Sequence, residues 1–274
     1  MSWRFALSPK WIVRHVAVVL LVAGMLSLLA WQLDRLHEKR DYKELVEGRE
    51  AQPAVAVEDL LAPGLHDGDA AVKAVLYRLA TAEGTYVADR TVVVENRTSS
   101  DDSPGGWVLT PLALHDGRSV LVNRGFVGYD ADGEIVAPPA PTGVVHVSGL
   151  LFPSQHRGSF GAADSEGGVL QVVKRVDLDR IDEQVDGDLL PAYLQLTHSD
   201  PAEPPVRKGA AAVEALGPPE VSEGPHLSYA VQWGIFSTIA TVGYGLLLRK
   251  VAGEEGQRAL AQAAAGPPDD AEPV

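Results

Sequence analysis

The sequence predicts a membrane protein of the α+β class, in which two transmembrane helices flank a mostly antiparallel β domain with minor helices. Residues 16–33 and residues 227–248 carry no formally charged side chain, which predicts the two helices. Between them, short runs rich in β-branched and aromatic residues are broken by glycine, proline and aspartate, which predicts the strands.

Residues 16–33, "VAVVLLVAGMLSLLAWQL", form the first predicted span. A helix of this length covers about 27 Å at about 1.5 Å per residue, the lower end of what crosses a hydrocarbon core, and residues 11–15 can extend it. A cleaved signal peptide is the alternative, because Arg4, Lys10 and Arg14 give the chain a basic start. The apolar run is too long for that and leads into "AWQLDR" without a small-residue cleavage pattern, so we interpret the span as retained.

Residues 227–248 form the second predicted span, which is about 33 Å long as a helix and is followed by a basic pair. The segment between the spans, residues 34–226, holds 17 lysines and arginines against 32 aspartates and glutamates. The positive-inside rule therefore places residues 1–15 and 249–274 in the cytoplasm. The sequence thus predicts a multi-pass protein of the cell (inner) membrane, with its 193-residue middle as an extracytoplasmic domain.

The middle segment begins with the charged run "DRLHEKRDYKELVEGREA", which predicts that the first helix continues into water until Pro53 stops it. Strand signals follow, from "AVKAVLYRLATA" through "TYVADRTVVVENRT", "GGWVLTPLAL" and "RSVLVNRGFVGY" to "GVVHVSGLLF". Asp116 and Gly117 lie between two of these runs and predict a hairpin turn.

Four further segments complete the prediction. Residues 177–185 indicate a short helix, and residues 189–197 indicate a last strand. Residues 199–225 contain six prolines in 27 residues, which predicts an extended linker back to the membrane. The acidic, alanine-rich tail, residues 249–274, predicts disorder.

The composition excludes several classes of function. The chain has no cysteine, which excludes disulfides and thiol redox chemistry, and its two methionines argue against a soft copper site. A net charge of −14 argues against nucleic acid. No catalytic triad pattern, nucleotide-binding loop or metal-ligand spacing is present, so the sequence does not predict an enzyme. Five scattered histidines are expected to face solvent: His66, His115, His146, His156 and His198.

A histidine and three aromatic residues lie on one face at the start of the second span, at helical spacings of i, i+3, i+7 and i+10: His226, Tyr229, Trp233 and Phe236. An aromatic belt at the membrane interface and an interfacial histidine without a ligand are the plain interpretations. His226, however, follows a proline in the first turn, where the helix dipole favours a neutral, metal-ligating imidazole.

The first span ends in Trp31, Gln32 and Arg35, which an antiparallel partner brings to the same interface. An imidazole, a guanidinium and aromatic rings suit a haem, with nitrogen to iron, cation to propionate and rings against the macrocycle. A second face of the helix carries small residues, which predicts close packing against Gly24 and Ser27 of the first span. That face consists of Gly234, Thr238, Thr241 and Gly245.

The motif "SVLVNRG" in the middle segment places Val120 and Val122 on one face of a strand, with Leu121 and Asn123 on the other. The glycine that follows permits a bulge or a close backbone approach. Arg124 has two interpretations, as a structural salt-bridge partner or as part of a docking surface.

Three segments carry a family resemblance: "WQLDRLHEKR", "LHDGRSVLVNRGFVGYD" and "PPEVSEGPHLSYAVQWGIF". Their order and positions resemble the Surfeit locus protein 1 family of cytochrome c oxidase assembly factors, over about Trp31 to Arg249. The resemblance implies a two-span protein that assists maturation of haem–copper oxidase subunit I, in many lineages by handling haem a. The family's haem-linked histidine falls on His226, and the asparagines that often precede it are replaced here by "EGP".

Residues and resemblance together predict a bacterial assembly factor for an aa3-type oxidase. In the first hypothesis it carries or inserts haem a, with subunit I and haem a synthase as partners. His226 then ligates the iron, and four further residues hold the cofactor: Tyr229, Trp233, Trp31 and Arg35. In the second hypothesis it binds no haem and is a scaffold that stabilises folding subunit I or an oxidase supercomplex.

Overall fold

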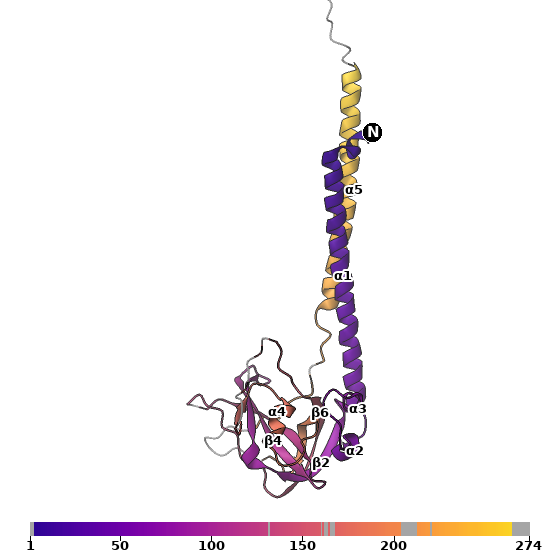
Figure 1. Ribbon diagram of the computed structural model, residues 1–274. Coiled ribbons are helices and arrows are strands. Elements are labelled where there is room, and N and C mark those ends of the chain that lie inside the picture. Colours follow the sequence, from indigo (N-terminus) through magenta and orange to yellow (C-terminus); the bar gives the residue numbers. More distant parts are fainter. Residues whose placement is uncertain are drawn as a thin grey trace, which may run out of the picture. The chain divides into compact units, whose positions relative to one another are not determined.

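The structure, a computed structural model, describes residues 3–130, 132–159, 161, 164, 168–203, 213–219 and 221–264. It comprises two compact units. The first, the helix pair, consists of the chain up to Lys43 and from Val221 onward. The second, the β domain, consists of residues 44–220 (Figure 1).

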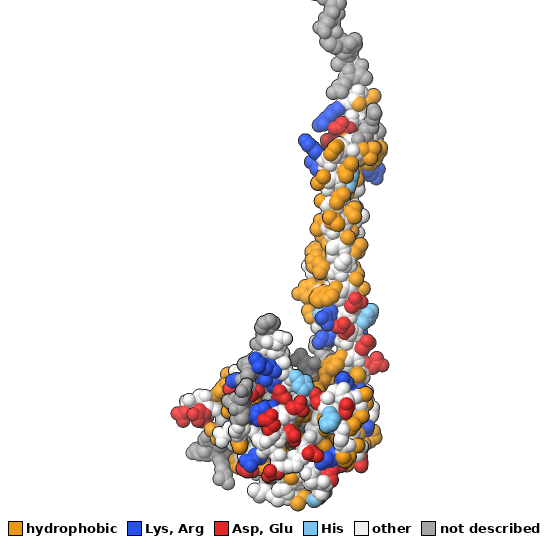
Figure 2. Space-filling view, viewed as in Figure 1, with side chains coloured by type: hydrophobic (Ala, Val, Ile, Leu, Met, Phe, Trp, Pro, Cys, Tyr) orange, Lys and Arg blue, Asp and Glu red, His pale blue; other side chains and the backbone are white. Residues whose placement is uncertain are grey.

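The helix pair consists of two long helices that follow a short 3-10 helix, η1 (Arg4–Leu7). Helix α1 (Pro9–Glu50) begins with a proline, which suits a first helical position because no hydrogen bond is lost there. Helix α5 (His226–Ala264) forms the other half. Both are long and apolar enough to cross a membrane, and hydrophobic side chains cover their middle while charged ones gather beyond it (Figure 2). The predicted pair of helices flanking a mostly antiparallel β domain is confirmed.

The predicted disorder after the second span is wrong as far as Ala264, because α5 continues through Arg249 to that residue. The segment "QRALAQAAA" consists mainly of strong helix formers. It extends a helix that is already formed, so it avoids the cost of nucleation. Residues 265–274 of the tail lie outside the described residues.

The two helices run antiparallel and side by side (Figure 1). Near the start of α1, the His15 Nδ1 atom lies 2.6 Å from the hydroxyl of Tyr244. Near the start of α5, the His226 Nδ1 atom lies 2.8 Å from Oε1 of Gln32. A hydrogen bond therefore joins the helices near each end of the charge-free stretches. These two hydrogen bonds fix how the helices are rotated about their axes.

The packing face of α5 differs from the predicted one. Ala230 and Ser237 are buried, and Gly234 lies against Leu29. Only Gly234 is shared with the predicted stripe, and the remaining predicted residues are exposed: Thr238, Thr241, Gly245, Gly24 and Ser27. Small residues occur on two adjacent faces of this helix, and the polar contacts at its ends select the face that carries Ala230.

Replacing Gly234 by leucine is expected to destabilise the helix pair, because a Cβ at this position would lie 3.3 Å from Leu29 Cδ1. Overpacking of this kind costs about 1–3 kcal/mol. Gly245→Leu is the matched control, since no atom lies within 4 Å of a Cβ there. Thermal unfolding of the detergent-purified chain measures the difference, and equal unfolding temperatures for the two variants would place Gly234 on the lipid-facing side.

The β domain is built on one eight-stranded sheet with the order β1-β2-β6-β8-β5-β4-β3-β7. The pairs are antiparallel except β1–β2, β3–β7 and β5–β8. A further pairing of β2 with β4 closes β2, β6, β8, β5 and β4 into a ring. The strands are β1 (Val55–Ala56), β2 (Leu79–Tyr86), β3 (Val92–Thr98), β4 (Pro104–Leu114), β5 (Ser119–Gly128), β6 (Val144–Pro153), β7 (Val172–Val173) and β8 (Ala192–Asp200).

Ring closure depends on a glycine in β2. Gly84 pairs with Leu114 of β4 on one side and with Val145 of β6 on the other. A Cβ at Gly84 would collide with the carbonyl of Ala113. The close approach of two strands at this point is therefore open only to glycine.

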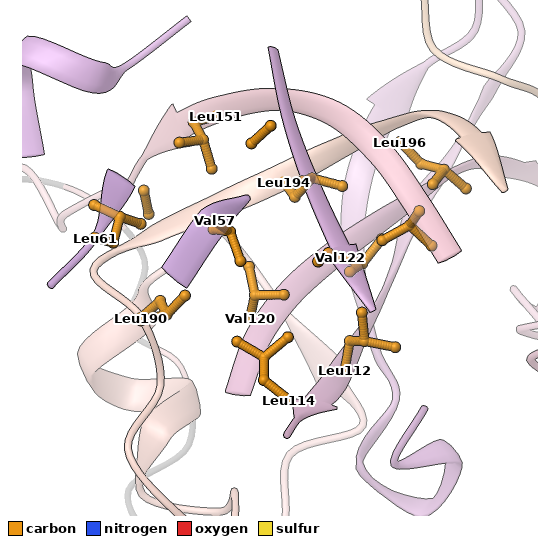
Figure 3. Close-up of a cluster of buried hydrophobic side chains, with 14 of the residues drawn as sticks. Val57, Leu61, Leu112, Leu114, Val120, Val122, Leu151, Leu190, Leu194 and Leu196 are labelled. Carbon is orange, nitrogen blue, oxygen red and sulfur yellow. The ribbon is translucent and has the colours of Figure 1, made fainter. Parts of the chain in front are cut away.

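Two hydrophobic clusters fill the two sides of the sheet. The larger cluster includes Val120 and Val122 of β5, and the side chains in Figure 3 converge on it from several strands and from α2 (Val57–Leu60). The smaller cluster includes Leu121, and α4 (Leu178–Asp182) packs on it. The predicted alternation along this strand is confirmed, and so is the turn at Asp116–Gly117 between β4 and β5.

One predicted strand is partly wrong. The run "AVKAVLYRLATA" forms α3 (Ala70–Val75) before β2 begins at Leu79. Alanine and lysine favour the helix, and the spacing of Val72 and Val75 puts both on one face against the larger cluster. A 3-10 helix, η2 (Ala88–Arg90), likewise separates β2 from β3.

Described parts of the predicted linker belong to the β domain, while residues 204–212 and 220 lie outside the described residues and residues 221–225 belong to the helix pair. The first residues of the linker complete β8, which ends at Asp200. Glu203 then binds Arg124, and Glu214 exchanges two backbone hydrogen bonds of 2.8 Å with Phe126. Gly125 allows this approach, because its φ is +141° and a Cβ there would collide with the Glu214 carbonyl. The close backbone approach predicted for this glycine is confirmed.

Of the two interpretations of Arg124, the structure supports the structural salt bridge. The fully buried Arg124 side chain donates to Glu203 Oε1 at 3.0 Å and Oε2 at 2.5 Å, and also to the Pro138 and Pro139 carbonyls. The guanidinium carbon lies 5.8 Å from the centre of the Tyr86 ring. Burial, together with the charge of Glu203, raises the pKa of the Tyr86 hydroxyl far above its usual range. The motif thus encodes a buried ion pair inside the domain.

Replacing Glu203 by glutamine should strongly destabilise the β domain, because it leaves the Arg124 charge buried without its counter-ion. The expected loss is about 3–5 kcal/mol of unfolding free energy. Glu214→Gln is the control, since that side chain makes an exposed hydrogen bond to Ser100. Urea unfolding of the full chain followed by near-UV circular dichroism gives both values, and a Glu203→Gln midpoint equal to that of the control would contradict the role of the pair.

Candidate functional site

The first residue of α5, His226, contacts the partner helix through its ring. Its Nδ1 atom lies 2.8 Å from Oε1 of Gln32, and Gln32 is 8% exposed. The histidine follows Pro225, whose carbonyl accepts the amide of Tyr229 at 3.2 Å in the first turn of α5. The contact with Gln32 joins the two segments that the sequence analysis assigned to one interface.

The hydrogen bond to Gln32 determines which ring nitrogen of His226 is available. An amide oxygen only accepts, so Nδ1 is the donor in this contact, and in the neutral ring Nε2 then carries the free lone pair. Metal-ligating histidines commonly donate their second ring N–H to a carbonyl or carboxylate in the same way. The arrangement therefore leaves Nε2 of His226 free of the interhelical contact.

The segment before His226 lies beside that nitrogen. Gly224 has a φ of +64°, and a Cβ at this position would lie 3.5 Å from Nε2. The Gly224 amide donates to Ser222 Oγ at 3.1 Å, and Glu223 pairs with Arg40 of α1 at 3.0 Å. The "EGP" that stands in place of the family's asparagines thus adds an ion pair with α1 and places a glycine beside the ring.

The aromatic residues at this end of the helix pair are accessible. Trp31 is 49% exposed and Tyr229 is 47% exposed. Trp233 is half-buried, and its ring makes an edge contact with Phe236 at a centroid distance of 6.0 Å. These rings have free faces for a planar ligand or for lipid.

Arg35 does not reach the histidine in the way the sequence suggested. Its guanidinium pairs with Glu38 of the same helix at 2.6 Å and lies 6.0 Å from the Trp31 ring centre. The structure brings Gln32 to His226, and it brings Arg40 to the entrance of α5 through Glu223. The sequence analysis missed Arg40, although its position in the charged run after the first span was a signal for it.

His15, the other histidine that joins α1 to α5, provides a contrast. His15 Nε2 lies 3.1 Å from the carbonyl of Ala6, which only accepts, so this nitrogen donates. His15 Nδ1 then accepts the hydroxyl hydrogen of Tyr244. Both nitrogens of His15 are occupied, whereas His226 has one nitrogen free of the interhelical contact.

The residues around His226 fit a haem by their chemistry. A haem offers iron to an imidazole nitrogen, a flat apolar face to aromatic rings and two propionates to cations. The first two partners are present in Nε2 and the exposed rings. Arg35 and Arg40 supply cations, each now paired with a glutamate that a propionate would replace.

Two apolar helices that flank a mostly antiparallel β domain define a protein with two candidate membrane spans. The model of the SURF1 family matches residues 19–238, and the chain belongs to this family of cytochrome c oxidase assembly factors. The matched region contains both Gln32 and His226. The resemblance found in the sequence is confirmed.

Similar curated proteins come from mycobacteria. They are described as uncharacterized SURF1-like proteins of Mycobacterium tuberculosis, strains CDC 1551 and H37Rv, and of Mycobacterium bovis. Each is 26% identical over 243 residues, which covers 88% of this chain and 84% of the relative. The similarity therefore extends over both helices and the β domain.

Proposed function

We propose that this chain carries haem a to subunit I of an aa3-type cytochrome c oxidase, with Nε2 of His226 as the axial ligand of the iron. The observation that carries the proposal is the Gln32 contact, which engages Nδ1 and leaves Nε2 available. The chain holds and transfers the haem in this proposal and catalyses no reaction. Haem a synthase is the proposed donor and subunit I the proposed acceptor.

In this proposal the other residues of the site contact different parts of the haem. Trp31, Tyr229 and Trp233 pack on the macrocycle, and Arg35 binds a propionate. Arg35 is half-exposed and its present partner, Glu38, is on the same helix, so exchange of one carboxylate for another requires no movement of the helices. A carrier has to release its cargo, and exposed contacts of this kind are weak enough to permit release.

The proposed topology places both chain ends in the cytoplasm of a bacterium and the β domain outside the cell (inner) membrane. The basic residues that precede the first apolar stretch and follow the second support it. In this orientation the Gln32–His226 contact lies at the outer end of the helix pair, and the His15–Tyr244 contact lies at the inner end.

A scaffold that binds no haem is the second candidate, and one observation favours it. The Gln32–His226 hydrogen bond joins α1 to α5 just as the His15–Tyr244 bond does at the other end. A histidine with a purely structural role accounts for both contacts. The two candidates therefore differ in whether Nε2 of His226 has a partner.

Replacing His226 by alanine should remove the haem a signal from the reduced optical spectrum of the protein, purified in detergent from cells that make haem a. Gln32→Leu should weaken haem binding by about tenfold, the lower end for loss of an outer hydrogen-bond partner. Arg35→Ala should have a smaller effect, because water can solvate a propionate. His15→Ala is the matched control, since it also removes an interhelical hydrogen bond and should keep the haem.

The scaffold gives a different pattern. The purified wild-type chain then shows no haem, and His226→Ala and His15→Ala lower assembled oxidase to the same extent. That outcome would sink the carrier proposal and leave the structural role of both histidines intact.

The topology predicts that a cysteine at position 100 reacts with a membrane-impermeant maleimide in intact cells. Ser100 is exposed, and the chain has no native cysteine, so the label reports one site. A cysteine at exposed Ala261, in the extension of α5, should react only after the cells are permeabilised. Labelling of position 261 in intact cells, with position 100 protected, would show that the orientation is the reverse of the proposed one.

A further inference from the structure

A histidine and three aspartates meet on the surface of the β domain, from three segments far apart in sequence. One ligand atom each from His156, Asp177 and Asp179 lies within 4.8 Å of the other two. Asp67 adds a fourth group, with its Oδ2 atom 2.5 Å from His156 Nε2. The sequence analysis expected His156 to face solvent and found no metal-ligand spacing, because the cluster forms only through the fold.

The positions of these ligands are set by backbone contacts. The amide of Gln155 donates to the Val176 carbonyl at 2.7 Å, and the amide of Leu178 donates to Ser154 Oγ at 3.0 Å. Leu178 itself is 3% exposed in the smaller hydrophobic cluster. The segment after β6 is therefore tied to the start of α4, which fixes His156 beside the two aspartates that flank Leu178.

The charge of the cluster is unbalanced. Within the part of the chain that the structure describes, no lysine or arginine forms an ion pair with Asp67, Asp177 or Asp179. The nearby Arg118 pairs with Asp116. The three carboxylates therefore carry charge that no lysine or arginine of the described residues neutralises through an ion pair.

The cluster borders a cavity of about 250 Å³, which Asp67 and Asp179 help to line. Two further carboxylates of the same cavity wall belong to Asp182 and Asp188. Acidic side chains are visible on the face of the β domain that carries α4 (Figure 2). The cavity gives a hydrated cation a path to Asp179 and room for bound water.

We propose that His156, Asp177 and Asp179 form a binding site for a divalent transition-metal ion of the zinc class, with Asp67 as the hydrogen-bond partner that holds the His156 ring. One imidazole nitrogen with carboxylate oxygens is a ligand set that Zn²⁺ accepts, at distances of about 2.0–2.2 Å. Ligands at that distance from one ion lie about 3–4 Å apart, and these groups, which lie within 4.8 Å of one another, would reach that spacing after a shift of their side chains. The imidazole separates this site from the all-oxygen sites that Ca²⁺ and Mg²⁺ prefer.

A metal in this site joins two parts of the β domain, because His156 follows β6 and the two aspartates belong to the start of α4. Asp67, in the loop between α2 and α3, is attached to the site through its hydrogen bond to His156. An ion that binds only the folded arrangement stabilises it by mass action. The site is independent of His226, so failure of the haem proposal leaves it unaffected.

Zinc binding to the full chain in detergent, freed of metal with a chelator, tests the proposal. Isothermal titration with ZnCl₂ should show a site of one ion per chain, and Zn²⁺ should raise the unfolding temperature. His156→Ala and Asp177→Asn should each weaken this site at least about tenfold. His146→Ala is the matched control, because His146 also lies beside a carboxylate, 3.3 Å from Glu83, outside the proposed site.

The outcomes separate the proposal from its rivals. Loss of zinc binding in the His156 variant, with the control unchanged and both unfolding at the wild-type temperature in chelator, supports the site. Wild-type affinity in His156→Ala would overturn it, as would loss of binding in His146→Ala alone. Ca²⁺ binding as tight as Zn²⁺ binding, and unaffected by His156→Ala, would show only a general attraction of cations to acidic side chains. That outcome would also overturn the proposal.

Discussion

The pairing of α1 with α5 is the constraint on which the candidate site depends. Apolar side chains that face lipid give little direction to helix association, so small residues and polar contacts decide which faces meet. Here a hydrogen bond near each end decides it, between His15 and Tyr244 and between Gln32 and His226. With the rotation of α5 set in this way, Ala230 and Ser237 are buried and the rings of Trp31 and Tyr229 remain exposed. The same contact that orients the helices therefore exposes one nitrogen of His226.

The β domain meets its own requirements by bringing distant segments together. Ring closure at Gly84 brings β2 and β4 closer together than a side chain at this position allows. The buried charge of Arg124 requires a counter-ion, which comes from Glu203 beyond the end of β8. The His156 cluster follows the same principle, since its residues come from a loop, from the segment after β6 and from the start of α4. In each case one local demand is met by a residue that is distant in sequence.

Sequence patterns gave the features that depend on periodicity and turn chemistry. The charge-free spans, the hairpin at Asp116–Gly117 and the alternation along β5 are of this kind, because they follow from interactions between near neighbours. The packing face of α5 was predicted wrongly, since two adjacent faces carry small residues and composition does not distinguish them. The roles of Glu203 and Arg40 were missed for the related reason that their partners lie far along the chain. Proline content indicated a linker, although part of that segment packs on the domain to neutralise Arg124.

The two histidines that join α1 to α5 share a residue type and differ in their hydrogen bonds. His15 and His226 both join α1 to α5, and both lie at the edge of a charge-free stretch. The second nitrogen distinguishes them: that of His15 is bound to the Ala6 carbonyl, while that of His226 makes no hydrogen bond within the described part of the chain. Gly224 lies against this side of the His226 ring, and its φ of +64° accounts for a glycine there. A structural role uses both nitrogens of His15 and one nitrogen of His226. The nitrogen of His226 without a partner is therefore the feature that the carrier proposal explains and that the scaffold does not.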